Sequence, residues 1–168
     1  GEVRWNGEPV HALPVRRKAK LRHQSIGFVF QFYHLIPELT ALQNVLLGQM
    51  MFHTPLAYLQ RRQAIRARAL ALLEEVGLGQ RLDHRPAELS GGEKQRVAIA
   101  RALIAEPRVI LADEPTGNLD SETADGVLSL LFEINRERGI AFVLVTHNEE
   151  LAARCDRIVR LRDGRVVG

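Results

Sequence analysis

Two short apolar runs in the second half of the chain, separated by one helix-length segment, constrain the fold more than any other feature. They cover residues 109–112 and 141–145, and the second run is rich in β-branched and aromatic residues. The segment between them repeats apolar residues with helical spacing. Strand, helix and strand within roughly 30 residues make a βαβ unit, so we expect two parallel strands that are buried on both faces.

The helix of this unit should begin with Ser121 as its N-cap and end at Gly139, because these residue types favour the two helix ends. Its apolar face carries Ala124, Val127, Leu128, Leu131 and Ile134. A last strand over residues 158–161 should turn at Asp163–Gly164 into residues 166–167, since Asp-Gly is a strong hairpin signal.

The first half of the chain predicts short strands followed by a helical region. Residues 1–13 place Val and Trp between Gly, Asn and Pro, which is typical of short strands with tight turns. Residues 26–30 (IGFVF) form an apolar run that indicates a buried strand. A helical pattern follows, clearest over residues 61–76, and Gly77 provides a stop. We therefore expect an α/β domain in which residues from about 34 to about 100 form a largely helical insertion.

Composition excludes several classes of protein. The 168 residues suit one domain, and 46% apolar with 26% charged residues is ordinary for a globular protein. A net charge of +3 is too small to argue for a nucleic-acid partner. The longest apolar runs are far shorter than the ~20 residues that span a bilayer, so we expect membrane association only through a partner. The single cysteine, Cys155, fits a reducing compartment.

The segment LSGGEKQRVAIARAL, residues 89–103, predicts a helix with an exposed backbone at its start. Ser90 and Glu93 form a capping box. Gly91 and Gly92 leave the first turn without side chains, so an anion can approach backbone N–H groups at the positive end of the helix dipole. The alternative is simply a well-capped helix that packs through its alanines.

The segment RVILADEP, residues 108–115, ends a buried strand in two carboxylates. Asp113 and Glu114 fall at the carboxyl edge of the expected sheet, where ligands of α/β proteins bind. Adjacent side chains on a strand point apart, so one can hold Mg²⁺ through water while the other faces an attacking water. The alternative is a solvated Asp-Glu turn before proline.

Four linked motifs give the chain a close resemblance to a known family. LSGGEKQRVAIARAL is followed by VILADEPTGNLD and then by VTHN, and IGFVFQ precedes them. Their order and spacing resemble the signature, Walker B, D-loop, switch-histidine and Q-loop motifs of the nucleotide-binding subunits of ABC transporters. The segment QFYHLIPELTALQNV is similar to the lipoprotein-releasing, macrolide-exporter and cell-division branch of this family (LolD, MacB and FtsE-like).

The resemblance implies a fold and a set of site residues. The fold is α/β, with the mostly parallel sheet of P-loop NTPases and a helical subdomain, in one nucleotide-binding domain over residues 1–168. The cofactors are ATP and Mg²⁺. Catalytic roles fall on Glu114, as general base, and on His147, which would contact the γ-phosphate. ATP held by the opposite subunit would meet Ser90, Gly91, Gly92 and the D-loop residue Asp120, and Mg²⁺ would meet Gln31 and Asp113.

His147 illustrates why context matters. A lone histidine at a strand end is more often a structural residue, and the other five histidines share no spacing that suggests a zinc site. His147 follows the expected strand FVLVT, however, and so falls at the same sheet edge as Asp113 and Glu114. This placement favours a functional role.

The resemblance also implies partners and a place in the cell. Two copies would form a homodimer with ATP at their interface, on the cytoplasmic face of the inner membrane, and would drive a transmembrane permease subunit in export or lipoprotein release. The apolar cluster Phe30, Phe32, Tyr33, Leu35 and Ile36 fits a surface that receives this partner, although pure packing is the alternative. An FtsE-like ATPase that signals to a membrane partner without transport has the same motifs. A DNA-repair or chromosome-structure ATPase is disfavoured by the short spacing between Gln31 and Ser90.

The sequence lacks the G-x-x-x-x-G-K-[ST] phosphate loop that such ATPases need, since Lys18, Lys20 and Lys94 have no matching glycines. We expect an N-terminal strand, phosphate loop and first helix, about 30 residues or more, to be missing before Gly1. The chain alone would then be inactive. A natural non-hydrolysing paralogue is the alternative, which the presence of Glu114 and His147 disfavours.

Overall fold

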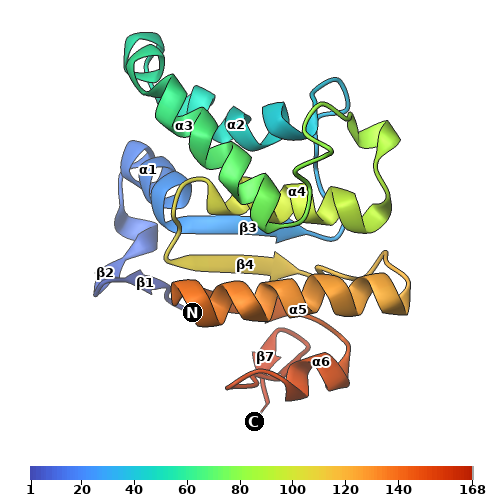
Figure 1. The fold of residues 1–168 in the computed structure, drawn as a ribbon. Helices are drawn as coiled ribbons and strands as arrows, with labels where there is room; N and C mark the ends of the chain where they lie inside the picture. Colours follow the sequence, from blue (N-terminus) through green and yellow to red (C-terminus); the bar gives the residue numbers. More distant parts are fainter. Residues whose placement is uncertain (168) are drawn as a thin grey trace.

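A three-stranded parallel sheet forms the centre of the molecule. The computed structural model describes residues 1–167, and its sheet has the order β3 (Ile26–Phe30), β4 (Val109–Asp113) and β5 (Ala141–Val145). Gly27 lies opposite Ile110, which lies opposite Phe142, so the strands are in register and their carboxyl ends meet at one edge (Figure 1). The three strands lie where the sequence predicts them, and the α/β class is confirmed.

Helices surround this sheet, and two small hairpins lie near the chain ends (Figure 1). The helices are α1 (Val15–Ser25), α2 (Ala41–Phe52), α3 (Pro55–Glu75), α4 (Gly91–Leu103), α5 (Ser121–Arg138) and α6 (Glu149–Ala153), with 3₁₀ turns η1 (Val10–Ala12) and η2 (Pro86–Glu88). The hairpins pair β1 (Arg4–Trp5) with β2 (Glu8–Pro9), and β6 (Leu161–Arg162) with β7 (Arg165–Val166). No helix within residues 1–167 is both long and apolar enough to cross a membrane.

The chain between β3 and β4 holds only helices and turns. Thr40 caps α2 in a capping box with Gln43, and Thr54 caps α3 ahead of a proline in its first turn. The helix predicted over residues 61–76 thus begins earlier, at Pro55. These helices share one apolar core with the sheet, which includes Val45, Leu72, Leu73, Ile99, Leu103 and Ile110.

The two faces of the sheet differ in burial, which corrects the expectation that both strands of the βαβ unit are buried on both faces. Helix α4 packs on the face that contains Gly27, where a Cβ would lie 3.0 Å from the Ala102 carbonyl oxygen. On the other face Val143 and Val145 are 52% and 57% exposed. Among the described residues β5 pairs only with β4, and the apolar run therefore predicts the strand but not its cover.

Two expected boundaries are also corrected. Asp120 rather than Ser121 caps α5, because its carboxylate accepts a 3.0 Å hydrogen bond from the Thr123 N–H, and Ser121 becomes the first helical residue. The final strand starts at Leu161 instead of residue 158. The predicted Asp163–Gly164 turn is present, with both residues at positive φ (50° and 72°), as a tight hairpin requires.

Candidate active site

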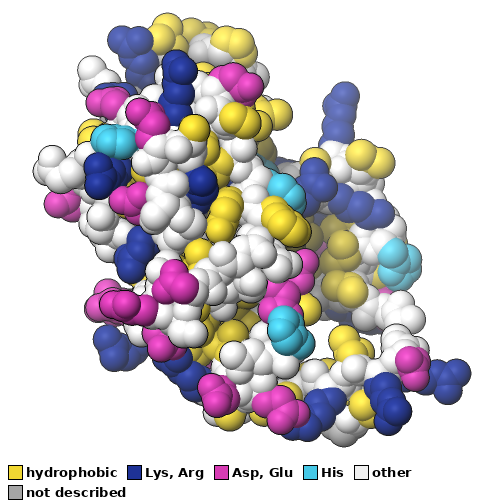
Figure 2. Space-filling view, turned by 90° about the vertical axis from the view of Figure 1, so that its right-hand side faces the viewer, with side chains coloured by type: hydrophobic (Ala, Val, Ile, Leu, Met, Phe, Trp, Pro, Cys, Tyr) yellow, Lys and Arg dark blue, Asp and Glu magenta, His cyan; other side chains and the backbone are white. Residues whose placement is uncertain are grey.

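Strand ends and helix starts converge at one edge of the molecule. Phe30, Asp113 and Val145 are register partners at the carboxyl ends of the three strands. The N-terminal ends of α4 and α5 point to this same edge (Figure 1). Figure 2 views the edge face on and shows acidic, basic and histidine side chains gathered around a hollow. The fold therefore collects the polar groups that follow each strand beside two positive helix ends.

Glu114 occupies a strained backbone position at this edge. Its φ of 44° lies in the left-handed region, which costs a non-glycine residue about 1 kcal/mol or more. Two backbone hydrogen bonds hold it there: the Glu114 N–H donates to the Val145 carbonyl (2.9 Å), and the Gly117 N–H donates to the Glu114 carbonyl (3.0 Å). The carboxylate is thereby turned away from the line of β4 and fixed against the end of β5.

The Glu114 carboxylate and His147 form the central pair of the site. Glu114 Oε1 accepts a hydrogen bond from the His147 backbone N–H (2.9 Å) and lies 2.7 Å from the ring Nδ1. The Glu114 side chain is 22% exposed and the His147 side chain is 87% exposed. With its proton on Nδ1, the ring donates to Glu114 and leaves Nε2 open to solvent. The two residues predicted to be catalytic thus lie in direct contact.

Gln31 is placed by the segment that follows Glu114. Its side-chain Nε2 donates to Asn118 Oδ1 (3.1 Å), and Asn118 Nδ2 donates to the Gln31 backbone carbonyl (3.1 Å). A Cβ at Gly117 would lie 2.8 Å from Gln31 Nε2, so glycine is needed for this close approach. The contact leaves the Gln31 side-chain oxygen free to accept.

Gln31 and Asp113 together offer hard oxygen ligands. Asp113 is exposed at the end of β4, next to the strand that carries Gln31. Within residues 1–167 no group of three or more His, Cys, Asp or Glu side chains is arranged to hold a metal alone. A sparse pair of oxygen donors is what Mg²⁺ uses when phosphate oxygens and water complete its shell, so the residues present fit this ion.

The first turn of α4 shows the predicted capping box. The Glu93 N–H donates to Ser90 Oγ (3.2 Å), and the Ser90 N–H donates to Glu93 Oε2 (2.8 Å). The two glycines serve packing as well as exposure. A Cβ at Gly92 would lie 2.3 Å from Thr123 Cγ2, and one at Gly91 would lie 3.0 Å from Leu119 Cδ2. The glycines therefore let the segment after Glu114 and the start of α5 close against α4.

Asp120 lies at the N-terminus of α5, fully exposed to solvent. The hydrogen bond from the Thr123 backbone N–H lowers the pKa of its carboxyl. Its cap ties it to the same helix start that packs on Gly92. Of the residues predicted for the site, Glu114 and His147 are in contact, and Gln31 and Asp113 lie at the ends of neighbouring strands. Ser90, Gly91, Gly92 and Asp120 lie at the starts of α4 and α5.

Arg101 supports the turn that follows Gln31, and the sequence patterns do not reveal this role. Its guanidinium donates to the carbonyls of Tyr33 (2.6 Å) and His34 (2.5 Å), which are successive residues with φ of 60° and 48°. Burial lowers the pKa of Arg101, and burial raises the pKa of the Tyr33 phenol. Arg101 thus anchors the turn after Gln31 to α4. Only the alternation of Arg with alanines in this helix could have drawn attention to it.

Comparison with known proteins decides the family. A family model described as ABC transporter matches residues 1–117. The chain belongs to the ABC transporter family. The ABC signature, Walker B and Q-loop motifs named from the sequence accordingly lie at the starts of α4 and at the ends of β4 and β3.

Several relatives show which members of the ABC transporter family the chain resembles. The lipoprotein-releasing system ATP-binding protein LolD of Geobacter metallireducens is 54% identical over 167 residues, which is 99% of this chain and 72% of the relative. LolD of Syntrophus aciditrophicus is 50% identical over the same shares. The dimeric structure of an ATP-binding cassette in a post-hydrolysis state, bound to ADP and Pi, matches with 42% identity and a TM-score of 0.81, over 99% of this chain and 71% of that one.

The glycine pair of the ABC signature makes a stability prediction. Gly92→Ala should lower the free energy of unfolding by about 1 to 3 kcal/mol, because its Cβ would overlap Thr123 Cγ2. Thr123→Ser removes that methyl group, so the double variant should recover most of the loss. Gly126→Ala is the matched control, since its Cβ would lie 3.4 Å from its nearest neighbour and alanine favours a helix. Urea unfolding measures all four; additive losses would contradict the packing account.

The capping box of α4 makes stability depend on pH. The hydrogen bond from the Ser90 backbone, with added contributions from Arg81, lowers the pKa of Glu93 below its ordinary 4.5. A lowered carboxyl pKa stabilises the fold above the unfolded-state pKa and loses this effect as pH falls through the folded-state pKa. Glu93→Gln should therefore melt about 2 to 4 °C lower than the unmodified chain at pH 7, with a gap that shrinks below pH ~4.5. A gap that widens toward low pH in calorimetry would contradict this.

Proposed function

We propose that this chain is the ATP-hydrolysing subunit of a lipoprotein-releasing ABC system that acts through a transmembrane partner. The observation that carries hydrolysis is the contact of Glu114 with His147 at the edge where the parallel strands end. The LolD relatives, 50% and 54% identical over 99% of the chain, support the lipoprotein-releasing system over other ABC systems.

Glu114 acts as the general base in this proposal. Its carboxylate takes a proton from the water that attacks the γ-phosphorus of ATP, and the products are ADP and phosphate. The backbone N–H and the ring of His147 both contact the carboxylate oxygen and fix its position. An uncharged ring does so without adding a positive charge that would neutralise the carboxylate. His147 Nε2, on the open side of the ring, faces the space where the γ-phosphate would bind.

In this proposal Asp113 and Gln31 bind Mg²⁺. Asp113 would hold the ion through water, and the free side-chain oxygen of Gln31 would approach it directly. When bound, the ion neutralises charge on the phosphate oxygens. The Asn118 contact keeps the Gln31 amide group oriented for this role.

Two copies complete the site in this proposal. The start of α4 lies at the same edge as Glu114, where its first turn is open to a ligand held by a second copy. Ser90, Gly91 and Gly92 of one copy then cover the γ-phosphate of ATP bound to the other, and Asp120 lies between the copies. The 42% identical cassette was solved as a dimer bound to ADP and Pi, which supports the arrangement.

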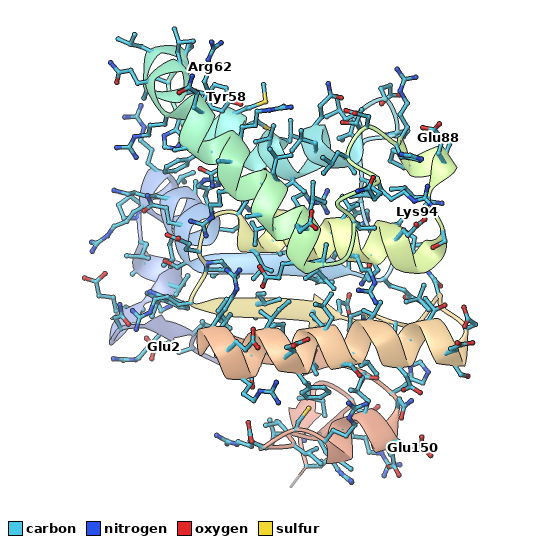
Figure 3. The ribbon with its side chains drawn as sticks, viewed as in Figure 1. Glu2, Tyr58, Arg62, Glu88, Lys94 and Glu150 are labelled. Atoms are coloured by element: carbon cyan, nitrogen blue, oxygen red, sulfur yellow. The ribbon has the colours of Figure 1, made fainter. Side chains whose placement is uncertain are left out.

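The transmembrane partner would bind beside the turn after Gln31, on the cytoplasmic face of the inner membrane. Of the apolar cluster expected to receive it, Phe32 and Ile36 are 68% and 40% exposed, whereas Tyr33 and Leu35 are half-buried against the fold. Phe32 and Ile36 are therefore the better residues to test. In Figure 3, Tyr58 and Arg62 of α3 lie on one side of the view, and Glu88 and Lys94, near the start of α4, lie on the other.

Partner binding is testable with matched serine variants. We expect the double variant Phe32→Ser, Ile36→Ser to reduce co-purification of the membrane subunit about tenfold or more. The loss of buried apolar area should weaken binding by about 1.4 kcal/mol or more, which is a tenfold change in affinity. Leu56→Ser, at an equally exposed residue on α3, is the control and should leave recovery unchanged. Equal recovery of all variants would contradict this docking surface.

Transport itself is tested on a phosphate-loop fusion, in which residues 1–168 follow a segment that supplies a G-x-x-x-x-G-K-[ST] loop. The fusion is reconstituted in vesicles with the membrane protein that co-purifies with it. ATP-dependent release of a lipoprotein from the vesicles supports the proposal. ATP hydrolysis without release would instead favour an FtsE-like signalling role, and absence of hydrolysis in the fusion would contradict the ATPase assignment.

A further inference from the structure

Gln95 is a fully buried polar residue in the second turn of α4. Its side chain is 0% exposed, and its Nε2 donates a 2.6 Å hydrogen bond to the backbone carbonyl of Pro115. Its other amide atom, Oε1, is buried and has no hydrogen-bond partner within residues 1–167. One half of this amide is therefore strongly engaged and the other half is left unsatisfied.

The acceptor of this bond belongs to the segment that presents Glu114. Pro115 directly follows Glu114 and is itself buried. The backbone around Glu114 is strained, with φ of 44°, and its backbone ties on the other sides are to Val145 and, within the turn, to Gly117. The bond from Gln95 adds the tie to α4, so three separate contacts hold the left-handed turn in place.

Gln95 also lies close to the first turn of α4. It is five residues after the N-cap Ser90, about 7 Å along the helix at 1.5 Å per residue. Gly92, between Ser90 and Gln95, is also buried and packs closely against Thr123, so both ends of this stretch are held against the fold. Gln95 is thus the side chain that joins this part of α4 to Pro115 by a hydrogen bond.

The unsatisfied Oε1 argues that stability is not what this glutamine provides. A buried amide with one unpaired atom forfeits much of the benefit of its one hydrogen bond. An apolar side chain of similar size, such as methionine, would avoid that loss while filling the same space. The amide gives what methionine cannot, which is a directed contact to the Pro115 carbonyl.

We propose that Gln95 is a positioning residue, which fixes the turn that carries Glu114 to the helix whose first turn contacts the nucleotide. This inference rests on the proposed function and deepens it. Glu114 is aligned for hydrolysis only when α4 occupies the place that the nucleotide between two copies imposes. The same side chain thus links the signature helix of one copy to the general base of that copy.

Amide hydrogen exchange in the unmodified chain and in Gln95→Met tests the positioning directly. The Glu114 N–H and the His147 N–H report on the turn, because they donate to Val145 and to the Glu114 carboxylate. We expect both to exchange at least about tenfold faster in Gln95→Met, while amides in the middle of α5 are unchanged. Gln49→Met is the matched control, since Gln49 is also a buried helical glutamine but lines a cavity with His23, Phe52 and Ile104.

Steady-state hydrolysis by the phosphate-loop fusion gives the second readout. Gln95→Met should lower kcat about 10- to 100-fold, as a small misplacement of a catalytic group does, and leave the KM for ATP within about twofold. A variant that only loosened the fold would instead lose activity in step with its melting temperature. Gln95→Leu repeats the test with a second apolar side chain should Gln95→Met fail to fold.

The outcomes separate this inference from the proposed function. Unchanged exchange at Glu114 and His147, or an equal acceleration in Gln49→Met, would overturn the role of Gln95. Unchanged kcat in a folded Gln95 variant would overturn it as well. An unmodified fusion that hydrolyses no ATP would contradict the proposed function, while faster exchange at Glu114 and His147 would still support the placement of the turn by Gln95.

Discussion

Glu114→Gln is expected to keep ATP binding and to lower hydrolysis by the phosphate-loop fusion about 10²- to 10⁴-fold, the usual loss when a general base is removed. The amide has the size of the carboxylate, and its oxygen can still accept from the His147 N–H. The geometry of the turn therefore persists, while no group remains to take the proton of the attacking water. Single-turnover hydrolysis of radiolabelled ATP measures the effect.

The matched control for this variant is Glu75→Gln. Glu75 is a partly exposed glutamate of α3 that is paired with Arg138, and it lies outside the strand edge that carries Glu114. We expect Glu75→Gln to hydrolyse ATP within about twofold of the unmodified fusion. Near-normal hydrolysis by Glu114→Gln would contradict the role of this carboxylate, even if ATP binding is intact.

Arg101→Met should lower the free energy of unfolding by about 2 to 3 kcal/mol, since two charge-assisted hydrogen bonds disappear. The carbonyls of Tyr33 and His34 would lose their donor at positions that already hold left-handed backbone. Methionine keeps much of the apolar stem of arginine, so the effect reports mainly on the guanidinium. Urea unfolding followed by circular dichroism measures it.

Two further variants make this result specific. Arg101→Lys should fall between the unmodified chain and Arg101→Met, because an ammonium group cannot reproduce the planar fork of donors. Arg62→Met, at an exposed arginine of α3, should change stability by no more than about 0.5 kcal/mol. Equal losses for Arg62→Met and Arg101→Met would contradict the anchoring of the turn by Arg101.

The local elements of the fold follow well from the sequence. The apolar runs at residues 26–30 and 141–145 coincide with β3 and β5, because a short buried strand needs such a run and little else. The capping box of Ser90 and Glu93 also forms as predicted, since all of its atoms belong to one turn. Features that depend on a few neighbouring residues are thus readable from the chain.

Features that depend on contacts between distant residues cannot be read from the sequence in this way. Helix α1 has many basic residues and no buried ones, so it lacks the apolar periodicity that reveals a helix. The exposure of Val143 and Val145 depends on what covers the sheet, which no pattern within β5 specifies. The contacts from Arg101 to Tyr33 and from Gln95 to Pro115 join residues that are 68 and 20 positions apart.

The site shows the same division. Family motifs single out Glu114 and His147, and the structure brings these two residues into contact. The motifs do not show that Gly92 is needed for packing against Thr123, or that Gln31 is oriented by Asn118. These supporting contacts exist only in the folded chain, and they position the residues of the candidate site.

The sedimentation mass of the Glu114→Gln phosphate-loop fusion, with and without ATP and Mg²⁺, tests most directly whether two copies complete the site. This variant is expected to bind ATP without consuming it. We therefore expect the mass of one copy without nucleotide and of two copies at saturating ATP, with one ATP bound per copy. A single-copy mass with ATP bound would contradict a site shared between α4 of one copy and Glu114 of the other.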